Sequence, residues 1–317
     1  MKEIDTTRRD FLVEVARLYY EQDLSQLEIS RRCGISRSSV SNLLKLCRDQ
    51  GIVEIRINDS SSHTVRMQHA LCSRFDLAHA VVVQASPDPG QATVHVGRAA
   101  AAWLEPRTRD GLRIGISWGT TLYELVRHVS PAVHDGIEVV QLHGGLGAGN
   151  PDIDGFGLAQ KLAEKLRGSY RLVQAPMIVQ DAELKRMLLQ EPGIAQALRA
   201  GAAVDIALFG IGSNIPGISS LVRAGYLRAE ESLALLSQGA VGTVCGLQID
   251  AQGRALTSGV NDRLIGIDRD TLVRIPLRLG AAAGAQKADA VLAALRGNLI
   301  TTLVVDEEVA ARILAAE

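Results

Sequence analysis

The chain is 317 residues long, with a formal net charge of -1, 47% hydrophobic residues and 22% charged residues. This composition predicts a globular protein that buries a sizeable core and divides into a small and a large domain. The first residues, MKEIDTTRRD, lack the apolar stretch of a secretory signal, and no apolar run approaches the roughly 20 residues that span a bilayer, so we expect a cytoplasmic protein with no membrane partner. The four cysteines have neither the spacing of a zinc site nor the density of a disulfide framework, and we expect them to be reduced, with no metal or cofactor.

Three short helices are predicted at the N-terminus. Residues 8–22 place apolar side chains on one helical face: Phe11, Val15, Leu18 and Tyr19. A second helix begins after Ser25, with Glu28 in capping-box position, and ends at a glycine turn. Ser36 can cap a third helix that covers about residues 37–50. This layout is typical of a helix-turn-helix.

The third helix has the chemistry of a DNA-reading helix. Its exposed N-terminal side chains are short or forked enough to meet base edges and phosphates: Ser36, Arg37, Ser38, Ser39 and Asn42. Residues 31–48 include five basic residues and no acidic one, and Arg31, Lys45 and Arg48 are suited to phosphate contacts. The opposite face carries apolar residues that can pack on the other two helices: Val40, Leu43, Leu44 and Cys47. A helical hairpin with a solvated basic face is the alternative, but the basic run, the turn and the polar helix start together favour binding to double-stranded operator DNA.

A second domain follows a strand-like IVEIRI segment and a polar linker at residues 58–63. We therefore predict a winged-helix-like DNA-binding domain at residues 1–58 and an effector-binding and oligomerisation domain at residues 59–317. Apolar runs alternate with helical segments along the second domain, at residues 80–83, 112–117, 137–142, 204–212 and 300–305. Such alternation predicts a Rossmann-like open α/β fold with a parallel sheet covered on both faces.

The segment GISWGTTLYELV runs from a strand through a small-residue turn into a helix. Backbone amides at such a helix start, with the hydroxyls of Ser117, Thr120 and Thr121 beside Gly119, can hold an anion. The segment lacks a Walker lysine and the glycine spacing of a dinucleotide site, so a small phosphate ester fits better than a nucleotide. The alternative is that Thr120 only caps the helix.

Two further loops carry polar groups after predicted strands. The glycine-rich stretch VVQLHGGLGAGNPDIDG offers a set of candidate effector contacts: His143, Gly144, Gly145, Asn150, Asp152 and Asp154. Lys287 begins a helix after another strand and is placed to meet a phosphate charge. Parallel strands gather such loops at one sheet edge, where ligands bind. Tight packing of the glycines, a structural role for His143 and simple solvation of Lys287 remain alternatives.

The order of these motifs resembles the SorC family of sugar-binding transcriptional regulators. The resemblance covers nearly the whole chain and rests on LSQLEISRRCGISRSSVSNLLK, GISWGTTL, VVQLHGGLG, DIALFGIG, GAVGTVCG, QKADAVLAALRG and LVVDEEVAARIL. It implies an effector domain similar in fold to glucosamine-6-phosphate isomerase, in a homodimer or homotetramer. It also implies that residues 119–121 form the phosphate loop, that His143 stands at a basic ligand contact and that Lys287 reaches the effector. Relatives often carry an acidic residue where this chain has Thr243, so recognition of ligand hydroxyls differs at this position.

The sequence therefore predicts a regulator of carbohydrate or polyol catabolism whose operator binding responds to a small phosphorylated sugar or polyol. An isomerase or deaminase with an appended DNA-binding domain is the alternative from another class. Such an enzyme needs a positioned general base and an acid partner, and the sequence marks out no such pair. A third interpretation, a DNA-binding assembly protein without a ligand, leaves the glycine-rich loops unexplained.

Overall fold

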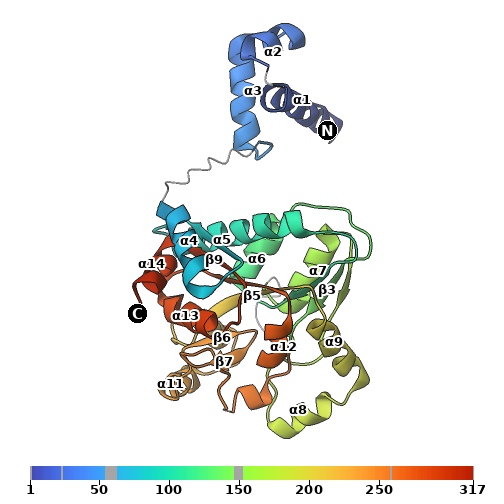
Figure 1. Ribbon diagram of the computed structural model, residues 1–317. Coiled ribbons are helices and arrows are strands. Elements are labelled where there is room, and N and C mark those ends of the chain that lie inside the picture. Colours follow the sequence, from blue (N-terminus) through green and yellow to red (C-terminus); the bar gives the residue numbers. More distant parts are fainter. Residues whose placement is uncertain (1, 23, 54–62, 146–152, 258, 317) are drawn as a thin grey trace. The chain divides into compact units, whose positions relative to one another are not determined.

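The computed structural model describes residues 2–22, 24–53, 63–145, 153–257 and 259–316. The chain divides into two compact units, Met1–Asp59 and Ser60–Glu317 (Figure 1). Within the described residues, no helix combines the length and the apolar character needed to cross a membrane. The four cysteines are free; Cys47 and Cys245 are buried, whereas Cys33 and Cys72 are partly exposed.

The described part of the N-terminal unit forms three helices, α1 (Lys2–Tyr20), α2 (Gln26–Cys33) and α3 (Arg37–Asp49). The predicted capping box is present, because Ser25 Oγ accepts a hydrogen bond from the Glu28 backbone and the Glu28 carboxylate accepts one from the Ser25 amide. Gly34 turns the chain with a φ of 66°. Apolar side chains of all three helices form the core: Leu12, Val15, Ala16, Leu18, Ile29, Val40, Leu44 and Cys47.

The chain after α3 departs from the predicted strand. Ile52 and Val53 lie in a bend, and the remainder of IVEIRI falls outside the described residues. A helix, α4 (His63–Phe75), begins at the end of the segment interpreted as a linker.

The second unit is built on a nine-stranded sheet. Its strands are β1 (His79–Val83), β2 (Arg113–Ile116), β3 (Glu138–Gln141), β4 (Ser169–Arg171), β5 (Ile206–Ser213), β6 (Gly242–Val244), β7 (Leu247–Ile249), β8 (Leu277–Ala282) and β9 (Thr302–Asp306). Seven strands are parallel in the order β1-β9-β8-β5-β2-β3-β4, and β6 and β7 extend β5 as an antiparallel pair. Chain connections run in opposite directions on the two sides of the β2–β5 pair, which makes this pair the switch point of the sheet.

Helices cover both faces of the sheet (Figure 1). Besides α4, the helices of this unit are α5 (Pro89–Leu104), α6 (Thr120–His128), α7 (Gly155–Lys165), α8 (Ala182–Leu188), α9 (Pro192–Ala202), α10 (Ser220–Arg223), α11 (Ala229–Ser237), α12 (Arg269–Arg274), α13 (Ala288–Arg296) and α14 (Glu307–Ala315). Successive residues of β5 alternate between two cores: Ile206 and Leu208 pack with α5–α7, and Ala207 and Phe209 pack with α4, α13 and α14. The continuous apolar runs of the sequence arise because the strands are buried on both faces.

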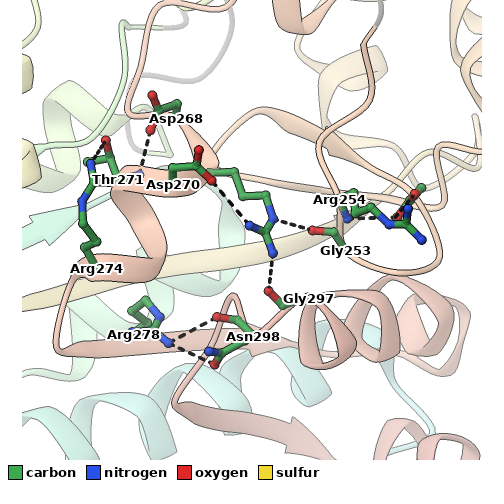
Figure 2. A network of polar contacts seen from close by, with 11 residues as sticks. Gly253, Arg254, Asp268, Asp270, Thr271, Arg274, Arg278, Gly297 and Asn298 are labelled. Carbon is green, nitrogen blue, oxygen red and sulfur yellow. Dashed lines mark hydrogen bonds and ion pairs between the residues drawn. The ribbon is translucent and has the colours of Figure 1, made fainter.

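A polar network joins α12, β8 and the turn after α13 (Figure 2). Arg269 donates to the carbonyl oxygens of Gly253 and Gly297, at 3.0 and 2.8 Å. The Arg278 side chain is buried and donates to the carbonyl oxygens of Leu299 and Asn298, both at 3.2 Å. These guanidinium groups satisfy backbone carbonyls at loop and helix ends, so the network is structural.

Candidate functional site

A pocket opens at the carboxyl ends of β2 and β5, at the switch point of the sheet where ligands bind in open α/β folds. Its lining residues come from five separate segments of the chain: Ser117, Trp118, Gly119, Thr120, Thr121, Gly210, Ile211, Gly212, Ile218, Ser220, Arg223, Thr243, Cys245, Gly246 and Lys287. Six candidate effector residues named from the sequence, Ser117, Gly119, Thr120, Thr121, Thr243 and Lys287, are therefore brought together in one place.

The turn after β2 presents a helix N-terminus to this pocket. Gly119 is the N-cap residue of α6, and its φ of 119° is a conformation that side chains disfavour. Within the described residues, no side-chain hydrogen bond caps the helix, so Thr120 does not have the capping role that was the alternative for it. Uncapped amides at the start of a helix attract negative charge.

Two cationic side chains line the same pocket. Lys287 follows β8 at the N-cap position of α13, where burial, reinforced by the nearby charge of Arg223 and opposed by Asp306, lowers its pKa to about 8. Arg223 ends α10 and is exposed. No carboxylate lines the pocket among the residues that the structure describes. The pocket is therefore suited to an anion.

Thr243 supplies a polar group with unused bonding capacity. The residue is 6% exposed, and its Oγ1 has no hydrogen-bond partner in the described part of the chain. A buried hydroxyl without a partner is unfavourable, and a ligand hydroxyl can supply the missing bond.

His143 lies behind the pocket wall instead of in it. The residue is 0% exposed, and its Nε2 and Nδ1 are 2.8 Å from Ser117 Oγ and the Gly144 carbonyl oxygen, respectively. Burial lowers the pKa of His143, more than its contact with Gly144 and the charge of Asp154 raise it. The ring is thus held neutral against Ser117.

The rest of the second glycine-rich loop has structural contacts. A side chain at Gly144 would place a Cβ 2.4 Å from the Ala175 carbonyl oxygen, so close backbone packing requires glycine there. The Gly145 carbonyl oxygen accepts a hydrogen bond of 2.8 Å from Tyr226, and the Asp154 carboxylate caps α7. These three residues are not among those lining the pocket, and Asn150 and Asp152 lie outside the described residues.

Several pocket residues were not identified from the sequence. Arg223 and Ser220 follow β5 on the segment SNIPGISSLVR, and the only available signal was that a loop after a parallel strand reaches the same sheet edge. Cys245 lines the pocket with a φ of 50°, and no sequence pattern marks such a conformation.

In the N-terminal unit, α3 presents the expected polar surface. Arg37, Ser38, Asn42 and Lys45 are exposed, as is Arg31 at the end of α2, whereas Ser39 is partly buried. Ser36 caps α3 by accepting a hydrogen bond of 3.0 Å from the Ser39 amide, and its Oγ lies 2.8 Å from the hydroxyls of Ser38 and Ser39. The opposite face is buried in the core, as predicted for Val40, Leu44 and Cys47.

Comparison with known proteins gives matches over both units. Residues 59–315 match the Sugar-bind family, a sugar-binding domain, and residues 15–61 match the MarR family. The deoxyribonucleoside regulator of Bacillus subtilis (strain 168) is 32% identical over 308 residues, covering 97% of this chain and 98% of that protein. The transcriptional regulator LsrR of Enterobacter sp. (strain 638) is 31% identical over 312 residues, covering 98% of this chain and 94% of that protein. The solved full-length sorbitol operon regulator SorC from Klebsiella pneumoniae has a TM-score of 0.84 at 27% identity, covering 96% of this chain and 98% of that one.

The helix-turn-helix, the parallel-sheet domain and these similarities define a DNA-binding transcriptional regulator with a sugar-binding domain. The chain belongs to the SorC family of sugar-binding transcriptional regulators. The predicted fold class and the preference for a regulator over an enzyme are confirmed.

Proposed function

We propose that this regulator binds a small phosphorylated sugar or polyol in the pocket at the switch point, and that binding changes its affinity for operator DNA. The observation that carries the proposal is the lining of that pocket. It combines Lys287 and Arg223 with a helix start and a Thr243 hydroxyl that have no side-chain cap and no hydrogen-bond partner, respectively, among the described residues. Cations and amides match a phosphate group, and hydroxyls match a carbon chain that bears hydroxyls.

The proposed effector contacts fall into two groups. Gly119, Thr120, Thr121 and Lys287 hold the phosphate, with Arg223 added from the structure, while Ser117 and Thr243 meet the hydroxyls. His143, Gly144, Gly145 and Asp154 shape the wall behind them, and Asn150 remains a candidate contact. The pocket chemistry favours sensing over catalysis, because the described lining offers no carboxylate and His143 reaches it only through Ser117.

The proposed DNA contacts lie on α2 and α3. Arg37 and Asn42 contact base edges, and Ser38 and Ser39 assist them. Ser36 positions the start of α3 against the DNA backbone, and Arg31 and Lys45 contact phosphates. A homodimer or homotetramer in the cytoplasm presents two such helices to a symmetric operator. The proposed targets are genes for the catabolism of the effector.

The proposal is tested with the full chain and named probes: inorganic phosphate, glycerol 3-phosphate, sorbitol 6-phosphate and the unphosphorylated polyols. A ligand of the folded state at 100 times its Kd adds about 2.7 kcal/mol of stability, so binding probes raise Tm. We expect Thr121→Val and Lys287→Ala to weaken the binding of phosphorylated probes and to abolish the effect of these probes on the affinity for a selected operator duplex. DNA binding without probe should remain intact. Normal probe affinity in both variants would show that the site lies elsewhere.

A further inference from the structure

Ser117 and His143 form a buried pair at the base of the proposed effector pocket. Ser117 is 2% exposed and lines the pocket, whereas His143 is 0% exposed and does not. Ser117 Oγ lies 2.8 Å from His143 Nε2, and His143 Nδ1 lies 2.8 Å from the Gly144 carbonyl oxygen. The histidine can therefore act on a ligand only through the serine.

The contacts of the ring determine which atoms carry hydrogen. A carbonyl oxygen only accepts hydrogen bonds, so Nδ1 must be the protonated nitrogen that donates to Gly144. Burial lowers the pKa of His143, which keeps the ring neutral and leaves a lone pair on Nε2. Ser117 consequently donates its single hydroxyl hydrogen to Nε2. Ser117 also has a hydrogen-bonding contact with the thiol of Cys245, whose pKa burial raises to about 12, so this thiol stays protonated and can donate to one lone pair of Ser117 Oγ. The remaining lone pair is then all that the hydroxyl can offer to the pocket.

We propose that His143 is a positioning residue that fixes the Ser117 hydroxyl as a hydrogen-bond acceptor, so that this part of the pocket selects a ligand hydroxyl and disfavours a phosphate oxygen. The inference rests on the proposed function and adds an orientation to it. A phosphate dianion has only acceptors and would face the remaining lone pair of Ser117, whereas a polyol hydroxyl can donate to it. The phosphate is thereby directed to Lys287 and the amides at the start of α6, and the hydroxyls to Ser117 and Thr243.

The direction of the hydroxyl can be tested without any ligand. We expect ¹⁵N spectra of the histidine-labelled full chain to show His143 as a neutral ring with Nδ1 protonated and Nε2 unprotonated. Ser117→Ala removes the hydrogen-bond donor to His143 Nε2 and should therefore shift the signal of this nitrogen. The shift also identifies the signal as that of His143. The matched control is Ser232→Ala, which removes another buried hydroxyl, 0% exposed and bonded to the Asn214 carbonyl oxygen at 2.6 Å, and should leave His143 unchanged. A ring protonated at Nε2, or a charged ring, would overturn the inference.

The effect on selectivity is measured by calorimetry with sorbitol 6-phosphate and inorganic phosphate. We expect Ser117→Ala to weaken the affinity for sorbitol 6-phosphate by about 2- to 10-fold, the range of one net hydrogen bond, and to leave the affinity for inorganic phosphate unchanged. His143→Phe frees the Ser117 hydroxyl to donate a hydrogen bond to the ligand, so it should raise the affinity for inorganic phosphate relative to that for sorbitol 6-phosphate. Equal changes for both probes would contradict the inference. If neither probe binds the unaltered chain, the proposed effector class and the selection of its hydroxyl both fail, while the ¹⁵N spectra still decide the hydroxyl direction.

Discussion

At the scale of single residues, the effect of the Thr243 hydroxyl on folding stability can be measured separately from its effect on effector affinity. Its Oγ1 is buried in the pocket without a partner in the described chain. Thr243→Val removes that hydroxyl while nearly preserving its shape. We expect an unchanged or slightly raised free energy of unfolding without ligand, because no hydrogen bond is lost, and a 2- to 10-fold weaker affinity for a phosphorylated polyol, roughly one hydrogen bond. Denaturant unfolding and calorimetry measure the two effects, and a large loss of stability would show that Thr243 is structural.

Lys287 gives the pocket a pH dependence. Its pKa of about 8 in the folded chain lies below the ordinary value of 10.5, so between these values the unfolded chain binds a proton that the folded chain has lost. The free energy of unfolding should therefore rise with pH across this window, and Lys287→Met should remove that rise. A bound phosphate favours the charged ammonium, so effector affinity should fall as pH increases above about 8.

The measurement is effector Kd at about pH 7 and about pH 9, combined with proton uptake from calorimetry. Lys287→Arg is the matched control, since a guanidinium stays charged over this range and should abolish the dependence. An unchanged Kd in the unaltered chain would show that Lys287 does not face the phosphate.

The pocket lining was predictable where polar groups lie in the turn or at the helix start that follows a parallel strand, as Ser117 and Thr121 do after β2 and Lys287 does after β8. Sequence could not show that His143 is sealed behind Ser117, because its burial depends on the segment 264–267 packing across the loop: Gly144 donates to the Ile265 carbonyl oxygen at 2.9 Å. The role of Arg223 could not be predicted either, because only the fold places it in the same pocket as Lys287, which lies 64 positions later in the chain.

At the scale of elements, the mostly buried strands β2, β3, β5 and β9 were predictable because they appear as continuous apolar runs, and the half-buried edge strand β1 also carries such a run. The edge strand β4 was missed because its three residues are exposed or half-buried and carry no apolar run. The α4 helix was missed because it buries only Met67 and Leu71 and follows a polar segment.

The α3 helix supports a prediction that separates base reading from phosphate binding. Arg37→Ala or Asn42→Ala should weaken operator binding and relax base preference by roughly 1–3 kcal/mol if the side chain reads a base. Both residues are exposed, so stability should not change. Fluorescence anisotropy with a selected operator and single-base variants measures both quantities.

Lys45→Ala is the companion variant on the same helix. Loss of one phosphate contact should weaken specific and non-specific duplexes alike and reduce the salt slope by roughly 1. Operator affinity that is unaffected in the Arg37 and Asn42 variants would remove the assignment of α3 as the recognition helix.

At the scale of the whole molecule, we expect DNA recognition to require more than one copy of the chain. A single three-helix unit covers little DNA, whereas two units related by a dyad address half-sites separated by a helical turn or its multiples. Light scattering at operator-binding concentrations should therefore give two or four times the chain mass of 33.9 kDa. The same mass should be found for the Arg37→Ala, Asn42→Ala and Lys45→Ala variants, because the large domain is expected to mediate assembly. A mass of one chain would contradict this prediction.

Effector and operator are proposed to bind separate units of the chain, so we expect any influence of one on the other to pass through a change in the predicted oligomer. An effector shifts DNA affinity only if it binds two arrangements of that oligomer unequally, and thermodynamic linkage makes the coupling equal in both directions. We therefore expect saturating operator duplex to change the Kd of a phosphorylated polyol by the factor with which the polyol changes the operator Kd, typically about 5- to 150-fold. Calorimetry of the polyol with operator and with a scrambled duplex measures one direction, and anisotropy with and without polyol measures the other. Lys45→Ala should weaken operator binding yet preserve the factor, because it removes a phosphate contact without altering the pocket. A factor of one in both directions would contradict the proposed coupling, and unequal factors would show that the two measurements do not share one equilibrium or that a third species binds.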